Sequence, residues 1–156
     1  MKQLIGNVLY GFDEEVAEWV AQRIHGYSPE KGVKALGVVK DGALVAGVTY
    51  ERWNGVHVEV SIAIDDPNWA TRDTMFLLFA YPFIRLGCEA ITVLVPSSNV
   101  KSINLATKMG FEPEALVKYA AFDGSSLVVM KMFKDKCRWI IRDGKRQQRT
   151  GGSGPV

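Results

Sequence analysis

The segment over residues 56–95 constrains the fold most, because it has the pattern of a strand, a helix and a second strand. Over 56–64, valine and isoleucine alternate with other residues, which is the period of a strand with one apolar face. A helical segment opens at Thr71 or Asp73 and runs to about Leu86, with a kink expected at Pro82, and residues 90–95 form a continuous apolar run. This order predicts two parallel strands joined by a right-handed crossover.

The rest of the chain predicts further helices and antiparallel strands around this unit. Asp13 stands where it could cap a helix, and Asp41-Gly42 and Asp123-Gly124 are two-residue hairpin signals. The predicted elements are a helix over 13–24, strands over 35–39 and 44–50, a helix from Ser98 or Asn99 to Met109 that stops at Gly110, and strands over 115–122 and 126–133. Together they predict an α/β domain with a mixed, mostly antiparallel sheet flanked by helices.

The chain has 156 residues, of which 47% are apolar, so we expect one domain over residues 1–135 with a single core. The longest apolar run, over 75–84, contains a proline and is far shorter than the ~20 residues of a membrane-spanning helix. We expect no membrane span and, since no export signal is evident, a cytoplasmic protein. Cys88 and Cys137 are then expected to be reduced, and we expect no metal site.

The basic residues are concentrated near the C-terminus. Residues 131–149 carry eight Lys or Arg and two Asp, a local charge of +6, whereas the whole chain has a net charge of +2. We therefore treat residues 136–156 as a basic tail, partly flexible, that is either a solvated extension or a contact for an acidic partner. Nucleic acid is one candidate partner, and Trp139 within the tail could stack on its bases.

Six residues that follow the strand at 90–95 have the spacing of a known cofactor site: Asn99, Ser102, Lys108, Gly110, Phe111 and Glu114. This pattern resembles the second half of the acetyl-CoA site of GCN5-related N-acetyltransferases (GNAT), and it is most similar to the ribosomal-protein N-terminal acetyltransferase branch. Trp69, Tyr81 and Phe83 extend the match towards the N-terminus, and the order of elements agrees over residues 10–134. The resemblance implies a sheet whose two parallel strands splay apart.

The resemblance also implies acetyl-CoA as co-substrate, bound at the carboxyl ends of these strands. The thioester carbonyl and the pantetheine arm would bind the backbone near Ile62, Ala63 and Ile64. The pyrophosphate would lie at a helix N-terminus, where free N–H groups favour anions. The further residues implied in cofactor binding are Trp69, Thr71, Arg72, Thr74, Asn99 and Ser102. The family's glycine-rich turn is replaced here, because Arg72 and Thr74 stand where glycine or alanine is usual.

Members of this family transfer the acyl group by direct attack of a neutral amine. Glu59 and His57 project from the same side of one strand, and either could accept the amine's proton, with Glu59 as the first choice. The tyrosine that often protonates the leaving thiolate is replaced by Ala106, so Tyr119, expected on the next strand, is the candidate acid.

The sequence predicts an acetyl-CoA-dependent N-acetyltransferase acting as a monomer or homodimer. It does not identify the acceptor, which could be a protein N-terminus, a lysine, a polyamine or a small molecule, because the acceptor loops expected at 27–34, 51–55 and 120–125 are of mixed composition. Two alternatives remain open. One is a non-catalytic module of the same fold that binds acyl-CoA or works through the tail on nucleic acid, and the other is a use of a different acyl donor.

Overall fold

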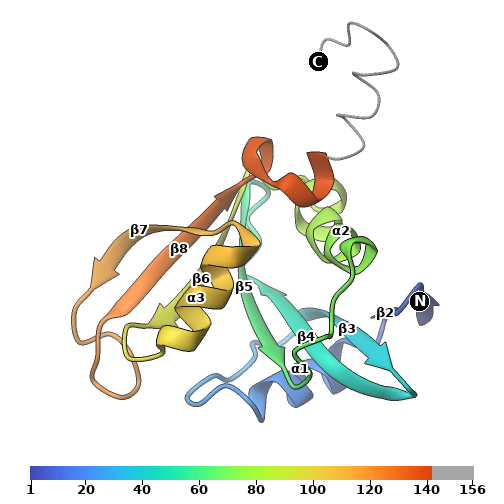
Figure 1. Cartoon of the computed structure of the whole chain (residues 1–156), viewed down its shortest axis with the longest axis horizontal. Coiled ribbons are helices and arrows are strands. Elements are labelled where there is room, and N and C mark those ends of the chain that lie inside the picture. Colours follow the sequence, from blue (N-terminus) through green and yellow to red (C-terminus); the bar gives the residue numbers. More distant parts are fainter. Residues whose placement is uncertain (142–156) are drawn as a thin grey trace, which may run out of the picture.

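The computed structural model describes residues 1–141, which fold around one eight-stranded sheet of strand order β1-β2-β3-β4-β5-β6-β8-β7 (Figure 1). The strands are β1 (Gln3–Ile5), β2 (Val8–Tyr10), β3 (Lys34–Lys40), β4 (Ala43–Glu51), β5 (His57–Ile64), β6 (Ala90–Pro96), β7 (Glu112–Val117) and β8 (Leu127–Phe133). The helices are α1 (Asp13–Ala21), α2 (Arg72–Ala80) and α3 (Val100–Met109). All strand pairs are antiparallel except β5 with β6, so the predicted mixed α/β fold is confirmed.

The parallel pair is joined only at its beginning. Residues 57–59 of β5 pair with residues 90–92 of β6, but the two strands continue separately to Ile64 and Pro96. Figure 1 shows these ends moving apart, with β4 beside β5 and β8 beside β6. We call the space between β5 and β6 beyond Glu59 and Thr92 the gap. The expected splay of the parallel strands is therefore present.

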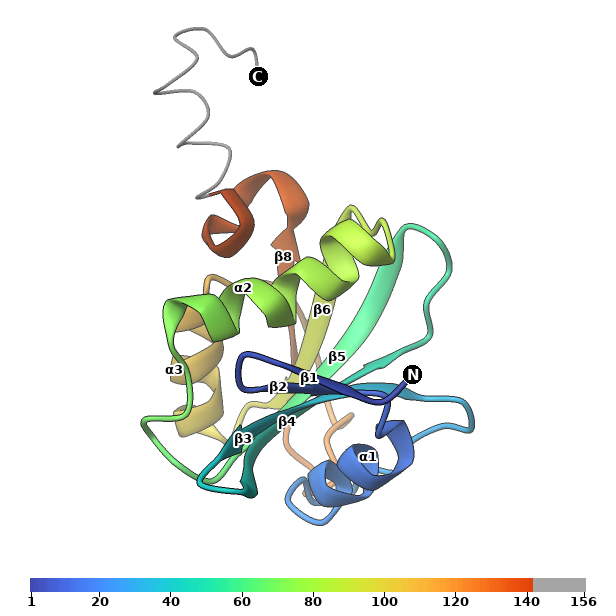
Figure 2. The same ribbon diagram turned by 90° about the vertical axis from the view of Figure 1, so that its right-hand side faces the viewer.

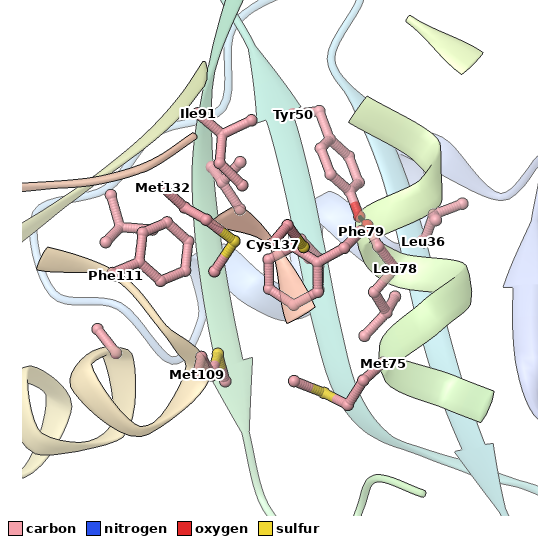
Figure 3. Packing of buried hydrophobic residues seen from close by; sticks show 14 of the residues in the cluster. Leu36, Tyr50, Met75, Leu78, Phe79, Ile91, Met109, Phe111, Met132 and Cys137 are labelled. Atoms are coloured by element: carbon pink, nitrogen blue, oxygen red, sulfur yellow. Dashed lines mark hydrogen bonds between the residues drawn. The ribbon is translucent and has the colours of Figure 1, made fainter. Parts of the chain in front are cut away.

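The helices cover the two faces of the sheet unequally, with α1 on one face and α2 on the other (Figure 2). Apolar residues of α1, including Val16 and Val20, pack on β3 and β4 where Gly37 and Gly47 leave room for close approach. The larger core lies between the sheet and α2 and α3, where Phe79, Met109 and many others meet (Figure 3). We refer to these surfaces as the α1 face and the α2/α3 face.

Helix α2 is capped and broken by its own sequence. Thr71 caps it, since its Oγ1 accepts the Thr74 N–H at 3.2 Å. Pro82 has no N–H for the carbonyl of Leu78 one turn back, and that carbonyl instead accepts the Tyr50 hydroxyl at 2.7 Å. The chain then forms a turn of π-helix over Tyr81–Arg85. The expected disruption at Pro82 is therefore present as a local change of helix type.

Three local predictions need correction. Two short N-terminal strands, β1 and β2, were not foreseen. Asp13 is the first residue of α1 and not its cap, because its carboxylate accepts the Ala35 N–H at 2.9 Å and ties the helix to β3. The last hairpin is not a two-residue turn: β7 ends at Val117, and a loop over residues 118–126 precedes β8.

Residues 137–141 belong to the tail predicted from the sequence, but they pack on the domain. Cys137 is 1% exposed within the main core, and like Cys88 it is a free thiol. The Trp139 indole N–H donates to the Met109 carbonyl at 2.8 Å, and Arg138 donates to the carbonyl of Lys108, so both satisfy carbonyls at the end of α3. The remaining basic residues of the predicted tail, over 142–149, lie outside the described part of the chain.

Within residues 1–141, no helix is both long enough and apolar enough to span a membrane.

Candidate active site

Strand β5 presents one unpaired backbone edge to the gap. Asp65 N–H donates to Val45 on the β4 side, whereas the Val56 carbonyl accepts Glu89 N–H on the β6 side. Backbone groups of successive residues in a strand point to opposite edges, so the even-numbered residues of β5 face β6. Beyond Glu59 these include Ile62 and Ile64, which lack a strand partner on that edge.

Ile62, Ala63 and Ile64, which are predicted to hold the cofactor, therefore differ in the edge of β5 that their backbone groups face. The backbone groups of Ile62 and Ile64 face the gap, as a ligand site would require. Those of Ala63 face β4, where Ala63 pairs with Gly47, and its side chain is buried under α1. The strand geometry thus gives two ligand-facing positions and one structural position.

Glu59 lies at the mouth of the gap on the α1 face, at the last residue of β5 that pairs with β6. Its two carboxylate oxygens accept hydrogen bonds from Nε and Nη2 of Arg52 at 2.9 and 2.7 Å. This bidentate pair raises the pKa of the Arg52 guanidinium above its usual value. Glu59 is therefore held in one orientation by a fixed cation.

A second carboxylate, Glu51, lies directly opposite Glu59 on the neighbouring strand. It is 3% exposed and accepts the Tyr27 hydroxyl and the Glu30 backbone N–H, each at 2.6 Å. Burial, together with the bond to Glu51, raises the pKa of Tyr27. Arg52 also lies within 3.5 Å of the Glu30 carboxylate, so one guanidinium faces three carboxylates.

Glu51 and Arg52 lie in the expected acceptor loop at 51–55, but they are not among the site residues that the sequence predicts. The sequence does contain a pattern that points to Glu51: once the strands over 44–50 and 56–64 are paired as a hairpin, Glu51 lies opposite Glu59. Like charges directly opposite on paired strands are destabilising unless a cation intervenes. Arg52, the next residue, supplies that cation.

His57 lies two residues before Glu59 and on the same face, as predicted. Its Nε2 is 2.6 Å from the hydroxyl of Thr92 on β6, which is 6% exposed. Burial lowers the pKa of His57, and the positive charge of Lys131 lowers it further, against an opposing effect of Glu59 and Glu114. The lowered pKa favours the neutral form of the imidazole.

Tyr119 is not on a strand, contrary to the prediction. It stands in the loop after β7 with φ of +56°, and 87% of its surface is exposed. Phe122 of the same loop packs on the His25 ring at a centroid distance of 4.5 Å, so this expected acceptor loop contacts the segment just before the one at 27–34.

Some residues predicted to bind the pyrophosphate form hydrogen bonds within the protein, whereas Arg72 is exposed. The Thr71 and Thr74 hydroxyls lie 3.0 Å apart, and Thr74, which is fully buried, donates to Asn7 at 2.7 Å. Thr74 is therefore a structural residue that holds the β1–β2 turn to α2. Arg72 is exposed at the first turn of α2 and has no ion-pair partner among residues 1–141.

The other predicted pair stands at the start of α3. Asn99 caps this helix, since its Oδ1 accepts the Ser102 N–H at 3.1 Å. The side chain of Ser102 makes no hydrogen bond within the described residues. In the chain, α2 follows β5 and α3 follows β6, so both helices begin after a strand that borders the gap.

On the α2/α3 face a narrow hollow of about 10 Å³ lies beside the gap. Its lining comes from β4, β5, β6, α2 and α3, and Trp69 is part of it. The lining residues are Val48, Tyr50, Val60, Ile62, Trp69, Leu78, Phe79, Pro82, Ile91 and Met109. Trp69 is thus a buried residue at the gap, 7% exposed, and not a surface residue of the turn before α2.

Comparisons with known proteins give matches in structure only. No protein-family model matches the chain, and no curated protein matches its sequence. A mutant form of the spermidine/spermine N-acetyltransferase SpeG from Vibrio cholerae superimposes with a TM-score of 0.61 at 19% identity, covering 83% of this chain and 80% of SpeG. A probable acetyltransferase gives a TM-score of 0.65 at 14% identity, covering 86% of this chain and 98% of the other.

These matches agree with the splayed parallel pair, the element order and the flanking helices. The ribosomal-protein N-terminal branch, which the sequence pattern favoured, is not among the structures compared above. The chain therefore has the fold of the GCN5-related N-acetyltransferases.

Proposed function

We propose that this protein is an acetyl-CoA-dependent N-acetyltransferase that acts on a cationic amine. The observation that carries the proposal is the unpaired edge of β5 in the gap, beginning directly after Glu59. Open backbone groups beside a held carboxylate are what acyl transfer to an amine requires: donors for a developing oxyanion and an acceptor for a proton.

The residues around the gap fit acetyl-CoA. The backbone groups of Ile62 and Ile64 can pair with the amides of a pantetheine arm in the manner of an added strand. The N–H groups that open α2 and α3 suit a pyrophosphate, and the exposed Arg72 adds a positive charge. When bound, acetyl-CoA supplies the activated acyl group.

On the α1 face the carboxylates favour a positively charged acceptor. Glu30, Glu51 and Glu59 face the single positive charge of Arg52, which leaves an excess of negative charge at the mouth of the gap. A polyamine is the first acceptor to test, since the similar SpeG is a spermidine/spermine N-acetyltransferase.

The acceptor amine must lose a proton before it attacks. Glu59 is the proposed proton acceptor because it lies at the mouth of the gap, beside the backbone that faces the thioester. His57 is the second candidate, since its lowered pKa favours the neutral imidazole and it lies on the same face as Glu59. The ion pair with Arg52 fixes the Glu59 carboxylate. The acceptor's ammonium must therefore share this carboxylate with the Arg52 guanidinium or displace the guanidinium from it.

The test measures thiol release from acetyl-CoA with a panel of amines that includes spermidine, peptide N-termini and lysine peptides. Glu59→Gln should lower turnover by ~10²–10⁴ with little change in acetyl-CoA affinity, the usual effect of losing a general base. His57→Gln is the matched control. Absence of acetyl-CoA binding in calorimetry would refute the proposal, and a larger loss in His57→Gln would exchange the two roles.

A non-catalytic acyl-CoA-binding module is the second candidate. The observation in its favour is that Ala106 replaces the usual acid, while Tyr119 is an exposed loop residue. Acetyl-CoA binding without thiol release for any amine would support it.

A further inference from the structure

Strand β7 forms one edge of the sheet, and nothing in the described part of the chain covers it. It is the last strand in the sheet order, beyond β8, and it lies at the outer side of the molecule in Figure 1. All six of its residues are exposed, including the apolar Leu116 and Val117 at 58% and 46%. An open edge with apolar side chains can pair with a strand of another chain, and natural proteins usually block such edges.

The backbone of Leu116 is free to pair at this edge. The Ser97 N–H donates to the Ser126 carbonyl, so the even-numbered residues of β8 direct their backbone groups to β6 and the odd-numbered residues direct theirs to β7. Ala115 and Val117 lie opposite odd-numbered residues of β8, so their backbone groups bond to that strand. Residue 116, between them, therefore points its N–H and its carbonyl away from the sheet.

Charged residues of opposite sign flank the apolar centre of β7, which is residues 115–117. Glu114 precedes this centre and Lys118 follows it, each two residues from Leu116. Lys118 is exposed and makes no ion pair within residues 1–141, whereas Glu114 accepts a hydrogen bond from Lys131 at 2.8 Å. The strand is therefore self-complementary: turned end for end about residue 116, it places a negative charge opposite a positive charge on both sides of the centre.

We infer that β7 is the strand through which two copies of this chain form a dimer, paired antiparallel about a two-fold axis at Leu116. In this register the Leu116 N–H of each copy donates to the Leu116 carbonyl of the other. Ala115 lies opposite the partner's Val117, and Glu114 lies opposite the partner's Lys118. The sheets of the two copies then form one continuous sheet.

Other registers match the side chains of β7 less well. A two-fold axis at Glu114 or at Lys118 would place like charges directly opposite each other, which is destabilising. An axis at Ala115 would place Glu114 opposite Leu116, and an axis at Val117 would place Lys118 opposite Leu116. The axis at Leu116 is the register that matches apolar with apolar residues and positive with negative ones.

The pairing is limited at both ends of β7, which favours a closed dimer over an open chain of copies. Pro113 has no N–H to donate, and the register with β8 is irregular between Pro113 and Ala115. Tyr119 has a φ of +56°, which is outside the range of a strand. Since both copies use the same strand, the two-fold pairing leaves no β7 edge for a third copy.

Sedimentation equilibrium on the full chain tests this surface. We expect the unaltered chain to form a dimer that dissociates on dilution, because a pairing of one short strand is a small interface. Lys118→Glu places like charges opposite each other twice and should raise the dissociation constant of the dimer about tenfold or more. Lys31→Glu is the matched control and should change nothing, because Lys31 is also exposed without an ion pair but lies between α1 and β3.

Exchange of the two charges tests the register and keeps the net charge of the chain. The double variant Glu114→Lys with Lys118→Glu restores opposite charges across the axis and should recover the dimer. Its only other loss is the exposed pair of Glu114 with Lys131, which contributes little. A chain that is monomeric up to ~0.5 mM, a dimer unchanged by Lys118→Glu, or a double variant no better than the single one would overturn the inference.

Hydrogen exchange on the unaltered protein avoids any dependence on the folding of variants. The Leu116 amide is unbonded at the edge of a monomer and bonded in the dimer, whereas the Val128 amide faces β6 in both. NMR should show slow exchange of the Leu116 amide at high protein concentration and fast exchange after dilution, with Val128 protected throughout. Exchange of Leu116 that is fast at every concentration would also overturn the inference. Neither experiment uses acetyl-CoA or an amine, so failure here leaves the proposed function untouched.

Discussion

Truncation near the C-terminus should separate a structural segment from the residues that follow it. Residues 137–141 join the ends of α2 and α3: the Trp139 ring stacks on Phe79 at 6.4 Å between centroids, and its N–H binds the Met109 carbonyl. Cys137 is buried in the same core, and Ile140 packs against it. A chain ending at residue 135 lacks all three of these side chains, whereas a chain ending at 141 keeps them.

The magnitude follows from what each missing side chain buries. A half-buried tryptophan with one hydrogen bond contributes about 2–3 kcal/mol to the free energy of unfolding, and the smaller Cys137 and Ile140 side chains about 1 kcal/mol each. The total of about 4–5 kcal/mol corresponds to a fall in Tm of about 8–20 °C for a domain of this size. Trp139→Phe keeps the ring stacking and should cost only about 1 kcal/mol.

The assay is thermal unfolding of the full chain, residues 1–141 and residues 1–135, followed by circular dichroism. We expect the first two to melt together and the third to melt at a clearly lower temperature. Because residues of α2 and α3 also line the hollow, the chain ending at residue 135 should bind acetyl-CoA more weakly than the two longer chains. Equal melting temperatures of the chains ending at 135 and 141 would refute the reasoning.

Three further changes test other parts of the site and fold. Arg72→Ala should weaken CoA by ~1–3 kcal/mol in calorimetry if its guanidinium binds phosphate, and unchanged affinity would make it a surface residue. The lowered pKa of His57 means that the unfolded chain binds more protons below about pH 6.5, so the free energy of unfolding should decrease as the pH falls through that range. Lys131→Met should raise that pKa towards its usual value, as NMR titration would show. Gly47→Ala should destabilise the protein by about 1–3 kcal/mol in denaturant unfolding, because the added Cβ would come within 2.7 Å of Val20.

Elements with a strong period or cap were predictable from the sequence. The alternation over 56–64, the Asp41-Gly42 turn and the Asn99 and Gly110 ends of α3 agree with the structure. Each depends on interactions between residues close in the chain, which sequence patterns record directly. The first ten residues were missed because β1 and β2 are only three residues each, too short to show a period.

The candidate site was predictable where it follows from strand alternation and not where it depends on tertiary contacts. Glu59 and His57 share a face, as expected from their spacing. The pairing of Glu59 with Arg52, and the use of the Thr74 hydroxyl by Asn7, join residues that no local pattern connects. Tyr119 was misplaced because the Asp123-Gly124 signal suggested a tight hairpin, whereas Asp123 accepts hydrogen bonds from Ser98 and Ser125 and holds a longer loop.

Different kinds of side chain border the gap between β5 and β6 on the two faces of the sheet. The hollow with Trp69 opens on the α2/α3 face, while the carboxylates around Arg52 lie on the α1 face. An acyl donor and an amine would then approach the sheet from opposite directions, and neither would need to leave before the other arrives. Steady-state kinetics should therefore give intersecting double-reciprocal lines, the signature of a ternary complex, and a product analogue of one reactant should not compete with the other.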